Sequence, residues 1–183
     1  MEFFFTFSEN LFDILLLKND IQTETLATST TLYRRDAMEK MKIVNARIEQ
    51  VSGGPDIPVF VGEAELKPES GNSIFLSIVE VEGNYPSIYK TDASIWDALV
   101  EPDDETFEKL QDNLLYEGEG YNDLFENRDS IECYEGVRYL VYLMRASWED
   151  IDKFIKKTKG KDLAKVKVPK SDAEKEWEES NEE

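Results

Sequence analysis

The sequence predicts an α+β fold, with an antiparallel sheet of three to five strands and two or three helices packed mainly on one of its faces. Three observations lead to this prediction. Stretches that alternate apolar and polar residues fill the chain between residues 41 and 82, and turn sequences separate them. Segments with helical spacing and capping residues follow after residue 94. The chain has 183 residues, 40% of them hydrophobic, which is enough for one domain with its own core.

Three strands are expected first. The stretch KIVNARIEQV at 42–51 alternates imperfectly and ends at SGGPD, a turn sequence. IPVFVGEAEL at 57–66 and SIFLSIVEVE at 73–82 follow, and KPESGN, a second turn sequence, separates them. Because successive strands with short connections pair as neighbours, these three predict an antiparallel meander.

Two helices are expected next. SIWDALV at 94–100 fits a short helix, and Pro102 is placed to open a second one. Carboxylates fill the first turn after this proline, where they favourably oppose the helix dipole. Phe107, Leu110 and Leu114 follow at i, i+3 and i+7, so the second helix has one apolar face and reaches at least Leu114.

The stretch GVRYLVYLMRA at 136–146 fits either a buried helix or a strand covered on both faces. We predict a strand, because Ser147 opens a capping signature almost directly afterwards and leaves no visible turn between two helices. The helix that Ser147 caps is expected to run to Gly160. AKVKVP at 164–169 is predicted to be a short edge strand, and the charged tail is predicted to be frayed.

The domain organisation predicted is an N-terminal extension or linker at 1–40, a single domain at 41–168 and an acidic tail at 169–183. Ser8 is placed to cap a short amphipathic helix in the extension, which suits docking better than anchoring because acidic residues interrupt its apolar run. Two interpretations of this region stay open. Residues 1–40 are a genuine extension, or the natural start lies at Met38 or Met41.

Charge and composition exclude several classes of function. The net charge is −19, which disfavours binding to nucleic acids and to anionic membranes and favours a basic protein partner. The chain has no histidine and a single cysteine, Cys133, so His-dependent triads and zinc sites are excluded, and a reducing, cytoplasmic location is expected. Neighbouring carboxylates are expected to raise the Cys133 pKa. No phosphate-binding glycine loop or EF-hand register is present, so no cofactor or metal is predicted.

Charge is segregated into blocks. Residues 97–135 carry fourteen Asp or Glu against Lys109 and Arg128, a local charge of −12, whereas residues 153–170 carry eight Lys against one Asp, or +7. One interpretation is a solvated acidic face that serves solubility and is partly neutralised by the lysine segment. The other is a surface with aromatic anchors that binds a basic partner, as a non-enzymatic immunity protein, an inhibitor or a DNA mimic would. The predicted partner-binding residues are Asp103, Asp104, Glu105, Tyr116, Glu117, Glu119, Tyr121, Asp123 and Phe125.

An enzymatic alternative rests on Pro55-Asp56 followed by Glu65-Leu66-Lys67. This pattern is similar to the PD…ExK signature of restriction-endonuclease-like nucleases, in which the acidic residues hold magnesium and the lysine assists the attacking water. If residues 57–67 form one extended strand, however, Asp56 and Glu65 lie about 30 Å apart. A shared metal would therefore require the chain to double back, and Gly62 is where it would do so.

Overall fold

The computed structural model describes residues 40–52, 58–81, 85–101 and 109–181. Glu39–Glu183 form one compact unit. The expected docking helix after Ser8, together with Asp56, Asp103, Asp104, Glu105 and Phe107, lies outside the described residues.

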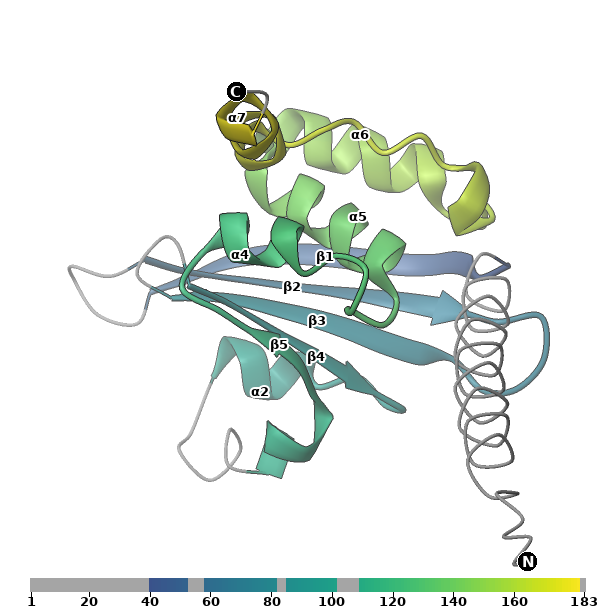
Figure 1. Ribbon diagram of the computed structural model, residues 1–183. Coiled ribbons are helices and arrows are strands. Elements are labelled where there is room, and N and C mark those ends of the chain that lie inside the picture. Colours follow the sequence, from purple (N-terminus) through teal and green to yellow (C-terminus); the bar gives the residue numbers. More distant parts are fainter. Residues whose placement is uncertain (1–39, 53–57, 82–84, 102–108, 182–183) are drawn as a thin grey trace, which may run out of the picture. The chain divides into compact units, whose positions relative to one another are not determined.

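A five-stranded antiparallel sheet in the order β1-β2-β3-β4-β5 confirms the predicted fold class (Figure 1). The three predicted strands are present as β1 (Lys42–Ser52), β2 (Pro58–Lys67) and β3 (Ile74–Val81). Two more were not predicted: β4 (Tyr85–Thr91) and β5 (Leu114–Glu117). Pro86 made the β4 segment look like a turn, but β4 pairs with β5 only from Ser87 onward, so on that side Pro86 lies at the edge of the sheet, where prolines are tolerated.

The helices are α2 (Trp96–Val100), α4 (Tyr121–Glu126), α5 (Tyr134–Arg145), α6 (Trp148–Thr158) and α7 (Asp172–Asn181), with short 3-10 turns η1 (Gln111–Asn113) and η2 (Leu163–Lys165). α4, α5, α6 and α7 lie on one side of the sheet, and α2 lies on the other (Figure 1). None of the helices formed by the described residues is long and apolar enough to cross a membrane.

Alternation along the strands gives the sheet two apolar faces. Val61 and Val79 pack with Leu99 of α2 on one face. On the other face α5 comes close to the strands: a Cβ added at Gly62 would lie 3.0 Å from Ile78 Cγ2 and 3.4 Å from Met144 Sδ. A glycine in the middle of β2 therefore marks where a helix packs closely on the strand, and the strand does not double back there.

The prediction of a strand at 136–146 is wrong, because these residues form helix α5. The helix is buried on two sides. One side faces the sheet, and on the other the rings of Tyr139 and Tyr142 lie 5.7 Å and 4.7 Å from the ring of Phe154 in α6. The helical period is present in the sequence, since Glu135, Arg138 and Arg145 lie on one less buried side at i, i+3 and i+10, but the apolar run between them also suits a strand covered on both faces. The turn between α5 and α6 consists of Ala146, in an extended conformation, and Ser147, the predicted cap, whose Oγ accepts from Asp150 N.

Three other predictions are also corrected. The helix expected to reach Leu114 ends before Gln111, and Leu114 instead begins β5 and pairs with Tyr89. Residues 164–169 form no strand; the edge of β1 is met by residues 160–163, where Leu163 N donates to Met41 O at 2.7 Å. The tail is not frayed over its described length but forms α7, which packs on α4.

Candidate functional site

A hollow of about 720 Å³ lies where α4, α5 and α7 meet. Four carboxylates and one guanidinium line it, so its formal charge is strongly negative. The lining residues are Glu119, Gly120, Tyr121, Asn122, Asp123, Arg145, Asp172, Ala173 and Glu176. We call this feature the acidic hollow. Three of the predicted partner-binding residues are among these.

The turn before α4 positions the predicted acidic side chains. Glu117 and Glu119 are exposed, and Asp123 is half-buried in the first turn of α4. The Asp123 carboxylate accepts a hydrogen bond from Glu119 N at 3.2 Å, which fixes the turn against the helix. The ring of Tyr116 packs along the same turn, and burial, reinforced by the charges of Asp123 and Glu126, raises its pKa to about 12. The Tyr116 phenol beside this turn therefore stays neutral at neutral pH.

Tyr121 and Phe125 are not the exposed aromatic anchors that the sequence suggested. They are 4% and 1% exposed, and the Phe125 ring lies 6.0 Å from that of Trp177 in α7. The helical spacing of these two residues was that of a core-facing stripe, since i and i+4 lie on one side of a helix. Their rings pack in the core beneath this surface, and the carboxylates face the solvent.

A buried polar cluster lies below the hollow. Glu80 of β3 is 1% exposed, and its carboxylate accepts a hydrogen bond of 2.6 Å from the Tyr121 hydroxyl. Arg145 lies 3.5 Å from the same carboxylate oxygen and 4.5 Å above the Tyr121 ring. Burial, with the nearby charge of Glu80, raises the pKa of Tyr121 well above its usual range, and Arg145 opposes that shift. The phenol therefore stays a hydrogen-bond donor, and α4, α5 and β3 are locked together.

α7 is held in place by aromatic and ionic contacts. Arg128 stacks 5.6 Å above the Trp177 ring, and Arg138 of α5 lies 2.9 Å from the Glu174 carboxylate. The composition of this helix is that of a solvated tail, and a frayed end was therefore predicted in its place. The signal that could have found it is a single tryptophan, with Ala173 one turn earlier, in an otherwise charged stretch.

The lysine segment does not neutralise the predicted acidic residues that the structure describes. Ion pairs join Lys153 to Glu149 and Lys156 to Asp152 within α6. Lys170 pairs with Glu178 of α7. Within the described ranges, no lysine of 153–170 pairs with an acidic residue of 109–135.

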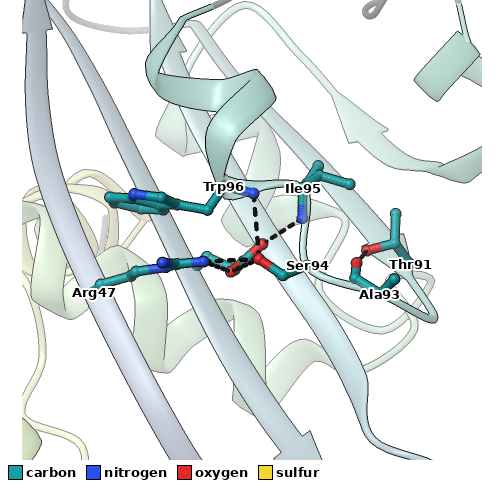
Figure 2. Close-up of polar contacts among 7 residues, drawn as sticks. Arg47, Thr91, Ala93, Ser94, Ile95 and Trp96 are labelled. Atoms are coloured by element: carbon teal, nitrogen blue, oxygen red, sulfur yellow. Dashed lines mark hydrogen bonds and ion pairs between the residues drawn. The ribbon is translucent and has the colours of Figure 1, made fainter.

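A second polar cluster lies on the α2 side of the sheet (Figure 2). Glu63 is 3% exposed and accepts hydrogen bonds from Arg47 at 2.7 Å, Ser94 at 2.7 Å and Ile95 N at 2.9 Å. Arg47 also stacks 4.2 Å from the centre of the Trp96 ring. Since the carboxylate accepts three hydrogen bonds, one from β1 and two from the segment just before α2, this cluster anchors the start of α2 to the sheet.

The metal site that the PD…ExK-like stretch implies finds little support. β2 is continuous from Pro58 to Lys67, so the chain does not double back at Gly62. The Glu65 carboxylate accepts a hydrogen bond from Ser73 at 2.7 Å. Within the described part of the chain, no three Cys, Asp or Glu side chains are arranged to hold a metal ion.

The Cys133 pKa is raised to about 12, in the direction predicted. The main cause, however, is burial. Glu132 adds to the shift and Lys90 opposes it. The thiol is therefore protonated at neutral pH and is a poor nucleophile.

Comparison with known proteins adds no relative: no family model matches the chain, and neither the curated proteins nor the solved structures include a significant match.

Proposed function

We propose that this protein is an acidic binding module whose acidic hollow engages a basic surface of another protein. The observation that carries the proposal is the convergence of carboxylates from two segments far apart in the chain on one concave space. Glu119 lies in the turn before α4 and Asp123 in the first turn of that helix, and Asp172 and Glu176 come from α7. The contact between Phe125 and Trp177 holds the two helices together.

The arrangement suits a protruding Lys or Arg side chain of a partner. A concave site removes such a side chain from water on several sides and strengthens its attraction to the surrounding carboxylates. Arg145 at the wall of the hollow forms an ion pair with Glu80, so the Glu119 and Glu176 carboxylates stay available to a partner. Complementary charge of this kind raises the rate of encounter and sets specificity more than it raises affinity.

The partner class that these properties favour is a protein that itself binds nucleic acid. The phosphate-binding surface of such a protein is basic, and carboxylates held on rigid helices compete for it in place of phosphates. The net charge of −19 supports this choice, because long-range attraction would steer the two proteins together. In this role the protein acts as an immunity protein or inhibitor that covers the target's basic cleft and performs no chemistry itself.

The proposal is tested by affinity capture from lysate with three baits: the wild type, Glu119→Gln with Glu176→Gln, and Glu49→Gln with Asp92→Asn. All four side chains are exposed, but Glu49 and Asp92 lie outside the hollow, so the second pair of changes controls for net charge. We expect one basic protein, retained at moderate salt by the wild type and the control and lost from the hollow variant. Equal retention by all three baits would contradict the proposal, and so would a broad set of basic proteins released together at low salt.

A further inference from the structure

Four exposed lysines gather at the end of the sheet where β1 begins and β2 ends. Lys42, the first residue of β1, pairs directly with Lys67, the last residue of β2. Lys159 and Lys161 follow the end of α6, and Ile43 N donates to the Lys161 carbonyl at 2.9 Å, which brings that segment alongside β1. We call these four residues the lysine cluster.

The lysine cluster is not explained by the stability of the fold. Like charges directly opposite each other on neighbouring strands destabilise a sheet. In the described part of the chain, none of the four lysines forms an ion pair, although Lys67 Nζ donates to Gly71 O at 2.7 Å. Asp162 lies opposite Lys42, but its carboxylate pairs with Lys165 at 3.5 Å. The cluster therefore keeps a net positive charge that an anionic group would neutralise.

The lysine cluster and the acidic hollow lie at the two ends of α6. Arg145, which lines the hollow, precedes the first residue of α6 by three positions, and Lys159 directly follows its last. The 11 residues of this helix span about 16 Å. Figure 1 shows α7 near one end of α6 and η2 at the other. The two oppositely charged surfaces therefore cannot meet within one molecule.

We propose that the lysine cluster of one copy of this chain binds the acidic hollow of a second copy, head to tail. The inference rests on the proposed function, since it names a second copy as the protein whose basic surface the hollow accepts. It goes further in assigning a role to the lysines. A head-to-tail contact between two copies leaves one unfilled hollow and one unfilled cluster, so the wild type forms oligomers larger than a dimer, as open chains or closed rings.

A second copy fits this cluster better than nucleic acid does. The net charge of −19 repels a phosphate backbone along its whole length. It also repels a second copy at low salt, but in about 0.15 M salt the Debye length is about 8 Å, and the touching surfaces then outweigh the distant charges. Self-association should therefore be strongest at intermediate salt and weaken towards about 1 M, where the Debye length is about 3 Å.

The test uses two charge-reversed variants in sedimentation velocity. The cluster variant is Lys42→Glu with Lys161→Glu, and the hollow variant is Glu119→Lys with Glu176→Lys. Each variant alone should remain monomeric, because one of its two surfaces is reversed. Mixed in equal amounts, they should associate, because the intact hollow of the first variant accepts the intact cluster of the second and the two reversed surfaces are complementary as well. The wild type should form larger species that grow with concentration.

Lys153→Glu with Lys156→Glu is the matched control for the cluster variant. It changes the net charge by the same amount, at exposed positions of α6, and should associate like the wild type. Circular dichroism confirms that each variant is folded. A mixture that stays monomeric overturns the inference, and so does loss of association in the control. If the wild type binds a labelled DNA duplex, the cluster variant does not, and the mixture stays monomeric, the inference is overturned in favour of nucleic acid. If the capture experiment succeeds while the mixture stays monomeric, the inference falls and the proposed function stands.

Discussion

Replacing Tyr121 with phenylalanine removes one hydroxyl group from beneath the acidic hollow and should lower the free energy of unfolding by about 2 kcal/mol. The hydroxyl donates a 2.6 Å hydrogen bond to the Glu80 carboxylate, which is 1% exposed. Hydrogen bonds to charged groups contribute about 1.5–3 kcal/mol, and a buried acceptor left without its donor cannot recover that energy from water. Arg145, 3.5 Å from the same carboxylate, remains and keeps the loss inside this range.

The matched control is Tyr139→Phe. Tyr139 is also buried, and its hydroxyl shares a 2.9 Å hydrogen bond with the hydroxyl of Thr158, so both partners are neutral. A neutral hydrogen bond contributes about 1 kcal/mol. The two substitutions remove the same atom from equally buried rings, and the difference between them measures the contribution of the charged acceptor.

Urea unfolding followed by far-UV circular dichroism measures both losses, and an unchanged m value supports the comparison. For a domain of this size, about 2 kcal/mol corresponds to a fall of about 4–8 °C in Tm. A double-mutant cycle of Tyr121→Phe with Glu80→Gln should give a coupling free energy of about 1 kcal/mol or more, because the two groups are in contact. If Tyr121→Phe costs no more than Tyr139→Phe, or if the cycle shows no coupling, the account of the buried cluster is refuted.

Two further predictions concern the core. Gly62→Ala should destabilise the fold by about 1–3 kcal/mol, since the added methyl overlaps Ile78 and Ile48 and overpacking outweighs the gain from a stiffer unfolded chain; an unchanged urea midpoint would contradict this. The Cys133 pKa is raised to about 12 in the folded state. The unfolded chain therefore releases the thiol proton first as pH rises, and the wild type should lose stability more steeply than Cys133→Ala between about pH 9 and about pH 12. Parallel urea midpoints for the two proteins across that range would show that the thiol is not buried.

The sequence alone determined the meander and the helix caps. β1, β2 and β3 alternate apolar and polar residues and are separated by turn sequences, so their pattern is local. The cap at Ser147 and the end of α6 near Gly160, whose φ is 78°, are also local, because each depends on a few neighbouring residues. Charge segregation was likewise visible in the sequence, including two of the four carboxylates that line the acidic hollow, Glu119 and Asp123.

Tertiary structure alone decided the rest. α5 is packed between the sheet and α6, and the apolar run that these contacts require also fits a buried strand, so only the tertiary packing separated the two interpretations. Leu114 joins β5 because β4 offers it a partner, which no local pattern shows. Whether an aromatic residue among carboxylates faces solvent or core also depends on distant residues: Glu80 and Arg145 hold Tyr121 inside. The hollow exists because Trp177 docks a distant charged helix onto α4. The local sequence of neither segment shows that the two will be in contact.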